Sequence, residues 1–215
     1  SSDVCSSDLA YVTRTLREFV SESPDVLSGE LNRAYARDGF ASQYTSQTRA
    51  WGTSIPAMQD HLRTLQANVE SAGDWRVLLE LPLYRLRRRI DFLVLTRSTV
   101  VVIELKVGAQ TFTSTDERQV EEYALDLRDF HAGSDGVAIL PCLWATEADH
   151  GQAYTRLSVG VNPVHRIGKQ GLAPLLQHVA NIEAALPTQV AEDWESAPYR
   201  PVPTVIQAAT TLFAD

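Results

Sequence analysis

Residues 76–106 read RVLLELPLYRLRRRIDFLVLTRSTVVVIELK, and this stretch decides the fold that the sequence predicts. It contains three segments rich in Val, Ile and Leu, at residues 76–84, 89–96 and 99–106. Each segment has the length and composition of a β-strand, and short polar connections separate them. Only two residues lie between the second and third segments, so we expect these two to form an antiparallel hairpin.

Helical periodicity flanks the three strands on both sides. Apolar residues at spacings of three and four predict one helix over Ile55–Val69 and another over Val120–Phe130. Residues 136–143 predict a fourth strand, and the apolar face of 171–186 predicts a further helix. Antiparallel strands followed by a helical crossover imply a mixed central sheet flanked by helices. We therefore predict an α/β fold with the element order αβββαβ.

Weaker patterns complete the expected layout. They predict two N-terminal helices, one near Leu16 and one beginning at Pro24, a polar loop at 43–47, a strand at 157–161 and a last helical stretch ending at Phe213.

The composition bounds the class of protein. The chain has 215 residues, a net charge of −8 and 44% hydrophobic residues, enough for one folded core. No apolar run reaches the length of a membrane span, and the overall acidity argues against binding nucleic acid through bulk charge. Two cysteines are too few for a disulfide framework, so a reducing, cytoplasmic compartment is expected.

The first nine residues, SSDVCSSDL, resemble a translated sequencing adapter. They lack the basic and apolar regions of a signal peptide. We therefore interpret residues 1–9 as an artefact and exclude them from the functional argument.

Three charged residues interrupt the apolar strands. Asp91 lies between Ile and Phe, and Glu104 lies between Ile and Leu, two positions before Lys106. Residues i and i+2 of a strand share a face, so Glu104 and Lys106 should project together, with Asp91 in reach across the hairpin. Burying two carboxylates is costly unless a cation compensates them, and oxygen ligands suit Mg²⁺ or Mn²⁺. The alternative is a set of solvated strand-end charges with Lys106 in a surface ion pair.

Lysine is rare in this chain. Only Lys106 and Lys169 are lysines, whereas seventeen residues are arginines. A lysine placed beside two buried carboxylates is therefore more informative than an average surface cation. Phosphodiester hydrolysis requires a metal that polarises the phosphoryl oxygen and activates water, and a cation that offsets the charge developing in the transition state. A metal held by carboxylates next to a lysine supplies both.

Asp91, followed after twelve intervening residues by Glu104-Leu105-Lys106, resembles the core motif of the PD-(D/E)XK nuclease superfamily. Gln119 and Tyr123 resemble the Gln-x-x-x-Tyr helix motif of several branches of that superfamily. The resemblance implies a restriction-endonuclease-like fold. In it, Asp91 and Glu104 would bind the metal and Lys106 would position or activate water. Gln119 and Tyr123 would support the lysine or contact the nucleic-acid backbone.

A narrower resemblance is to the N-terminal nuclease-like domain of bacterial Schlafen-type superfamily 1 helicase proteins. It rests on residues 47–51, the helix up to Val69, residues 122–127 and the YRPVPT tail at 199–204. It implies that residues 10–190 form the nuclease-like domain. Residues 191–215 would then be a linker and the start of a truncated C-terminal ATPase, a partner in cis.

Two assignments stay open at the level of sequence. The additional acidic ligand is either Glu80, inside the first strand, or Glu70, at the end of the preceding helix, and we favour Glu80. The second concerns the basic cluster next to Asp91, which either holds phosphates beside the metal or keeps a hairpin loop soluble. That cluster consists of Arg85, Arg87, Arg88 and Arg89.

The predicted activity is therefore metal-dependent hydrolysis of phosphodiester bonds, with DNA favoured over RNA as the substrate, in DNA repair or defence. Two alternatives are a catalytically idle nucleic-acid-binding module and a nuclease that acts on RNA or tRNA.

Overall fold

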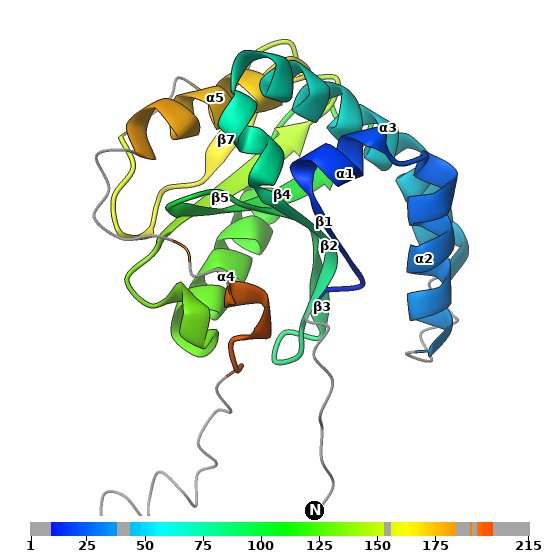
Figure 1. Cartoon of the computed structure of the whole chain (residues 1–215), viewed down its shortest axis with the longest axis horizontal. Helices are drawn as coiled ribbons and strands as arrows, with labels where there is room; N and C mark the ends of the chain where they lie inside the picture. The colour runs from blue at the N-terminus through cyan, green and yellow to red at the C-terminus, as the bar shows by residue number, and fades with distance from the viewer. Residues whose placement is uncertain (1–9, 38–43, 153–155, 184–189, 191–192, 200–215) are drawn as a thin grey trace, which may run out of the picture.

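The central feature of the molecule is one mixed β-sheet (Figure 1). The computed structural model describes residues 10–37, 44–152, 156–183, 190 and 193–199, and for 44–50 the backbone alone. Over these residues the sheet has seven strands in the order β1-β2-β3-β4-β5-β6, with β7 also paired to β5. It is an α/β fold with an open sheet flanked by helices.

The strands follow the sequence closely in the middle of the chain. β2 (Arg76–Leu83), β3 (Arg88–Leu95) and β4 (Thr99–Lys106) form an antiparallel meander. The chain then crosses through a helix, so β5 (Ala138–Ala145) pairs parallel to β4.

Three short strands complete the edges of the sheet. β1 (Val12–Thr15) pairs antiparallel to β2 at one edge. At the other edge, β6 (Gly160–Val161) pairs with the start of β5, and β7 (His165–Ile167) pairs with its end. The sequence predicted a single strand at 157–161, because a three-residue strand such as β7 carries too few residues to show a period of two.

One face of the sheet is covered by four helices. They are α1 (Leu16–Ser21), α2 (Pro24–Arg37), α3 (Tyr44–Asn68) and α5 (Leu172–Ile182). The core on this side includes Leu27, Leu62 and Leu176, none of which is exposed. Figure 1 shows α3 and α5 side by side over the sheet.

The opposite face is covered by α4 (Ser114–Phe130). Its buried side chains Val120, Ala124 and Leu127 pack on residues from β3, β4 and β5. The helix begins where the Thr113 hydroxyl accepts a hydrogen bond from the Asp116 N–H, which satisfies one of the free amides of the first turn. α4 thus connects β4 to β5 and presents one side to the carboxyl end of β4.

Within the described part of the chain, short 3₁₀ segments join some of these elements. They are η2 (Glu70–Asp74), η3 (Ala132–Ser134) and η5 (Trp194–Ser196).

The central expectations about the fold are confirmed, and the boundaries of some elements differ. The order α3-β2-β3-β4-α4-β5 reproduces the predicted αβββαβ order. The loop expected at 43–47 is wrong from Tyr44 onward, because α3 begins there. Further along this helix Trp51 and Ile55 are buried, and the helix tolerates Pro56 in its interior.

The segment 193–199 packs against the domain, although its composition predicts the beginning of a linker. Trp194 has no exposed surface, and the Arg76 guanidinium contacts the Glu195 carboxylate at 2.7 Å. Residues 1–9 and the expected final helix lie outside the described residues. None of the described helices is both long enough and apolar enough to cross a membrane.

His131 makes this packing dependent on pH. The residue is 1% exposed, and its ring centre lies 4.0 Å from that of Trp194. Burial lowers its pKa from about 6.5 to about 4. The unfolded chain therefore binds a proton between pH 6.5 and 4 that the folded chain does not, so stability falls as the pH is lowered through this window.

We predict that His131→Gln removes this part of the acid sensitivity. Between about pH 7 and about pH 4 the wild-type chain should lose up to about 3 kcal/mol more unfolding free energy than the variant. Urea denaturation at each pH measures the difference. Parallel stability profiles for the two proteins would contradict the prediction.

Candidate active site

The acidic residues meet where the pairing of β3 with β4 ends, beside the paired strand β2. The pairs Leu79↔Phe92 and Leu81↔Ile90 place Glu80 opposite Asp91. On the other side of β3, the pairing with β4 ends at Phe92↔Ile103, one position before Asp91 and Glu104. Beyond that point the Asp91 carboxylate accepts a hydrogen bond from the Leu105 N–H at 3.0 Å. A side chain thus takes the place of a backbone acceptor and keeps the two strands together.

Glu80 reverses the alternation of β2. Its backbone has a φ of +55°, a left-handed conformation that glutamate rarely adopts. Leu79 and Leu81, which would share a face in a regular strand, therefore lie in the cores on opposite faces of the sheet. The Glu80 side chain points toward the α2 and α3 side, where its hydrogen-bond partners lie.

The buried Glu80 carboxylate is held from three directions. Oε2 accepts a hydrogen bond from the Tyr35 hydroxyl at 2.8 Å, and Oε1 accepts one from Trp51 Nε1 at 2.8 Å. The Arg89 guanidinium lies 3.4 Å from Oε2 and also donates to the Tyr35 hydroxyl at 2.8 Å. These contacts explain how a strained backbone and a buried charge persist at this position.

Glu104 is the centre of a second network, built with α4. Its Oε1 accepts hydrogen bonds from Lys106 Nζ at 2.8 Å and from Gln119 Nε2 at 2.7 Å. The same Gln119 nitrogen lies 2.7 Å from the Tyr123 hydroxyl. Gln119 and Tyr123 are four residues apart and therefore share a face of the helix. The structure thus brings together four of the predicted site residues.

Asp116 belongs to this network and was not predicted from the sequence. Its Oδ1 lies 3.0 Å from Lys106 Nζ, and its other oxygen accepts a hydrogen bond from the Thr113 hydroxyl. Asp116 precedes Gln119 by three residues, so the two share a face of the helix. This spacing could have indicated Asp116 once the helix was placed.

Burial and crowding shift the ionisation of the carboxyl groups. The pKa of Asp91 is raised well above its usual range by desolvation and by the charges of Glu104 and Glu80. Desolvation also raises the pKa of Glu104, although the Lys106 ammonium opposes this shift. Desolvation raises the pKa of Tyr123 to about 12, with a contribution from the Glu104 charge. A cation bound beside Asp91 and Glu104 would therefore stabilise the ionised form of both carboxyl groups.

For Lys106, the interactions with neighbouring carboxylates outweigh the effect of desolvation on the pKa. Desolvation lowers the pKa of its ammonium, but hydrogen bonds to Glu104 and Asp116 and their charges outweigh it, so the net pKa is raised. Lys106 is therefore protonated at neutral pH.

Two of the three proposed metal ligands fit a hard divalent cation. Glu104 Oε2 is buried and has no hydrogen-bond partner among the described residues. Asp91 adds a second carboxylate whose ionisation its acidic neighbours disfavour. Mg²⁺ commonly uses one or two protein carboxylates and retains waters. Both oxygens of Glu80 accept hydrogen bonds, and within the described part of the chain no group of three or more His, Cys, Asp or Glu is arranged to hold a metal.

A cavity of about 470 Å³ opens onto these residues. Asp91, Glu104, Gln119 and Tyr123 form part of its wall. The rest of the wall comes from α3, the end of β2 and the β2–β3 turn, together with neighbouring residues of β3 and β4: Trp51, Ser54, Glu80, Arg87, Arg88, Arg89, Phe92, Leu105 and Val107.

The arginine cluster divides into distinct roles. Arg85 contacts Asp126 at 3.1 Å and stacks over the Phe130 ring, and it does not line the cavity. Arg88 lines the cavity but also contacts Glu122 on α4. Arg89 belongs to the Glu80 network. Arg87, which also lines the cavity, makes no hydrogen bond or ion pair with any described residue.

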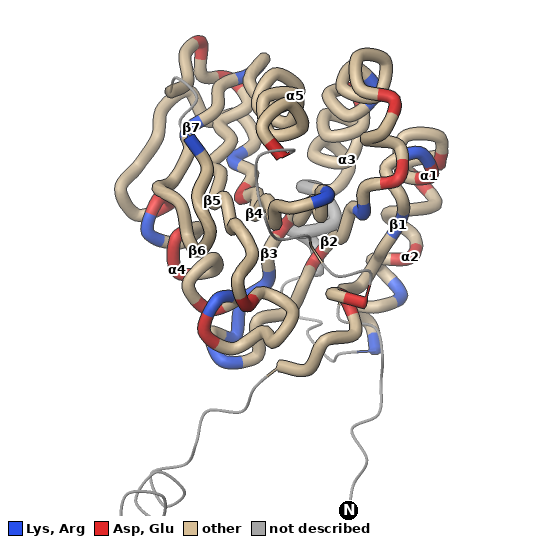
Figure 2. The backbone as a smooth tube through the Cα atoms, turned by 60° about the vertical axis from the view of Figure 1, so that its left-hand side comes forward, with Lys and Arg blue, Asp and Glu red and all other residues tan. Residues whose placement is uncertain are grey.

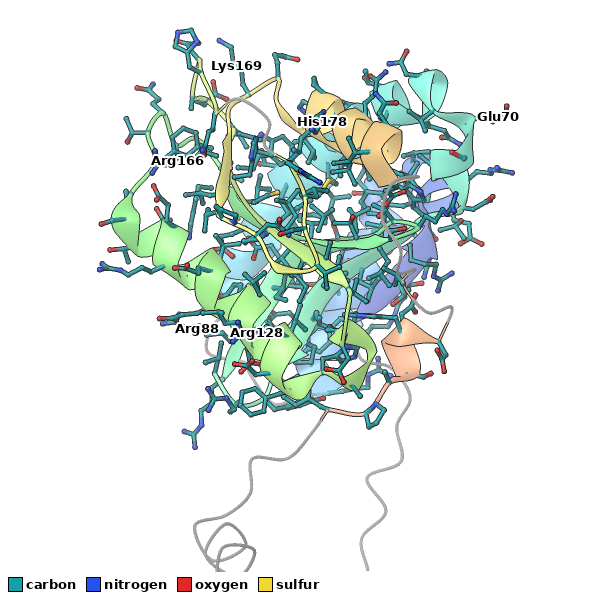
Figure 3. All side chains as sticks on the ribbon, turned by 90° about the vertical axis from the view of Figure 1, so that its left-hand side faces the viewer. Glu70, Arg88, Arg128, Arg166, Lys169 and His178 are labelled. Atoms are coloured by element: carbon teal, nitrogen blue, oxygen red, sulfur yellow. The ribbon has the colours of Figure 1, made fainter. Side chains whose placement is uncertain are left out.

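The alternative acidic residue lies elsewhere. Glu70 is exposed in η2 and does not line the cavity. Figure 3 shows it on the opposite side of the molecule from Arg88. Between the two candidates, the structure places only Glu80 beside Asp91.

Comparisons with known proteins do not identify a relative of this chain. No family model matches the chain, and neither a curated protein nor a solved structure shows significant similarity to it.

We predict that Asp91→Asn stabilises the chain in the absence of divalent cations. Asparagine retains an acceptor for the Leu105 N–H but removes a charge that Glu104 and Glu80 disfavour. Since the folded pKa of Asp91 is raised, the wild-type chain loses stability as the pH rises through that pKa. The variant should thus be more stable by on the order of 1 kcal/mol at about pH 8, with a smaller advantage at about pH 4.

Divalent cations should reverse this order. At roughly 100 times its Kd, Mg²⁺ or Mn²⁺ should stabilise the wild-type chain by about 2.7 kcal/mol. The gain should vanish in Asp91→Asn and persist in the control Glu70→Gln. Chemical denaturation with and without the metal measures both effects, and an equal metal response in all three proteins would contradict the assignment.

We also predict that Arg89 and Arg87 differ in their effect on stability. Arg89→Ala leaves the buried Glu80 carboxylate without its cation and should cost about 3 kcal/mol of unfolding free energy. Arg87→Ala removes an exposed side chain that has no polar partner among the described residues, and it should change stability by less than about 0.5 kcal/mol. Denaturation of both variants in urea tests this difference, and similar costs would show that the cluster acts as one unit.

Proposed function

We propose that this chain is a metal-dependent nuclease domain that hydrolyses phosphodiester bonds. The observation that carries the proposal is the pair of half-buried Asp91 and buried Glu104 beside Lys106, with a Glu104 oxygen that has no partner among the described residues. A pure scaffold gains nothing from buried like charges, whereas a cation site requires them. The arginines that line the cavity suit an anionic substrate.

Each residue has a role that its contacts allow. Asp91 and Glu104 would hold the cation, which would polarise a phosphoryl oxygen and lower the pKa of bound water. Lys106 is protonated, so it would orient the attacking water and offset charge on the phosphoryl oxygens rather than accept a proton. Gln119, held by Tyr123, would fix the Glu104 oxygen that faces Lys106.

Asp116 would keep Lys106 in place. Asp116 lies 3.0 Å from Nζ, so it would still anchor the ammonium if a cation on Glu104 weakened the attraction between Glu104 and Lys106. Glu80 would be a positioning residue rather than a metal ligand. Its hydrogen bonds with Tyr35 and Trp51 fix the β2 backbone opposite Asp91.

The proposed substrate is nucleic acid, with DNA favoured over RNA. The charges are dispersed: Figure 2 shows basic and acidic residues interspersed over the chain rather than gathered on one face. Binding would therefore depend on the local arginines Arg87 and Arg88 at the cavity. The low cysteine count favours a cytoplasmic setting. The Schlafen-type resemblance further implies a C-terminal ATPase that would deliver the strand to the site.

The proposal predicts cleavage that depends on the metal and on two residues. The wild-type chain should cleave single-stranded, duplex or branched DNA, or RNA, with Mg²⁺ or Mn²⁺ and not with EDTA. Glu104→Gln and Lys106→Ala should each lower the rate at least about 100-fold, because each removes a group that stabilises the transition state. Gel-resolved cleavage of labelled substrates measures the rates.

Arg128→Ala serves as the matched control. Arg128 is an exposed cation of α4 that contacts only its neighbour Asp129 among the described residues, so its loss should leave the rate unchanged. Equal rates in all four proteins would identify a contaminating nuclease and refute the proposal. Nucleic-acid binding without cleavage in any of them would favour the idle binding module.

A further inference from the structure

A second cavity adjoins the first along α3. It has a volume of about 640 Å³ and lies between α3, α5 and the loops that follow β4 and β5. Val107 lines both cavities, and the residue is 45% exposed. α3 contributes Trp51 and Ser54 to the first cavity and Thr53 and Ala57 to the second. We call the second one the α3–α5 cavity.

The two cavities differ in charge. Three arginines line the first, together with the carboxylates of Glu80, Asp91 and Glu104. No arginine occurs among the described residues that line the α3–α5 cavity, which carries the carboxylates of Asp60 and Glu147. Its cation, Lys169, contacts Asp149 at 2.6 Å. This lining disfavours a phosphate and suits a neutral group.

The remaining wall offers hydrogen bonds and apolar surface. Thr64, Thr146 and Gln170 supply polar groups, whereas Ala173 and Pro174 supply apolar ones. Pockets for small organic ligands combine apolar surface with a few polar groups, and the volume lies within their usual range of roughly 300–1,000 Å³.

His61 adds an aromatic ring to this wall. Its ring centre lies 4.9 Å from that of Trp144, edge to face, and Trp144 is buried beneath it. Desolvation lowers the pKa of His61, so the ring is neutral at neutral pH. The imidazole of His61, which packs against the buried indole of Trp144, can stack on a nucleobase. Because the imidazole is neutral, it does not attract a phosphate.

We propose that the α3–α5 cavity receives a nucleobase of the substrate strand, next to the phosphate held in the first cavity. The proposal rests on the nuclease function above and deepens it: the substrate is a single strand or an unpaired end. A base inside a continuous duplex is stacked and paired, and placing it in this cavity would require unstacking it against the duplex. Val107, which lines both cavities, would lie between the phosphate and the base.

Binding of oligonucleotides with one missing base tests the proposal. The probes are short fluorescent single-stranded DNAs in which an abasic site replaces each nucleotide in turn. Lys106→Ala with Mg²⁺ is the background, so that bound DNA stays intact. One position should bind about 10-fold more weakly when abasic, the scale of one stacked base. Fluorescence anisotropy measures Kd.

A cavity-filling variant identifies where that base binds. Thr53 is exposed on α3 and lines the α3–α5 cavity, so Thr53→Trp should fill it. In this variant the intact DNA should bind about 10-fold more weakly, and the abasic site should cause no further loss. Ala67→Trp, at an exposed position of α3 outside both cavities, is the control and should retain the abasic penalty.

The outcomes separate this inference from the nuclease function. An abasic penalty that persists unchanged in Thr53→Trp, or equal binding of every abasic probe, would overturn the base-binding cavity while leaving metal-dependent cleavage intact. A penalty abolished by Thr53→Trp, in a chain that never cleaves, would support the cavity and refute the nuclease. Equal affinity for blunt duplex and single strand would also count against the inference.

Discussion

The repulsion between Asp91 and Glu104 is the constraint on which the rest of the site depends. Two carboxylates lie next to each other on neighbouring strands, where burial raises the pKa of both. The fold responds with one ammonium, one amide and one backbone N–H, and it leaves a Glu104 oxygen without a partner among the described residues. Such an arrangement is costly for stability, and the proposed divalent cation would compensate its charge.

Glu80 shows how the scaffold supports that arrangement. Its left-handed backbone reverses the facing of β2 at the point opposite Asp91, and the α2 and α3 side chains Tyr35 and Trp51 hold its carboxylate. The N-terminal helices therefore do more than cover the sheet. They fix a strained residue, and that residue sets the geometry of the strand beside the site.

The charged residues that line each cavity matter more for the site than the net charge of the whole molecule. The net charge of −8 would repel nucleic acid at long range. Locally, the arginines of the β2–β3 turn divide between internal contacts and the cavity wall, whereas the adjoining α3–α5 cavity is lined mainly by neutral and acidic groups. In the proposed nuclease, this contrast would place a phosphate in one cavity and its base in the other.

The sequence by itself determined the strands at 76–106, the crossover through α4 and the face that Glu104 shares with Lys106, because these follow from apolar composition and a period of two. It also indicated the i, i+4 pair Gln119 and Tyr123. Only the tertiary structure decided that Glu80 rather than Glu70 lies opposite Asp91, which contacts each arginine makes, where Asp116 lies and that β1 joins the sheet. Each of these depends on contacts between residues far apart in the chain, or on a backbone reversal, and local periodicity carries no record of either.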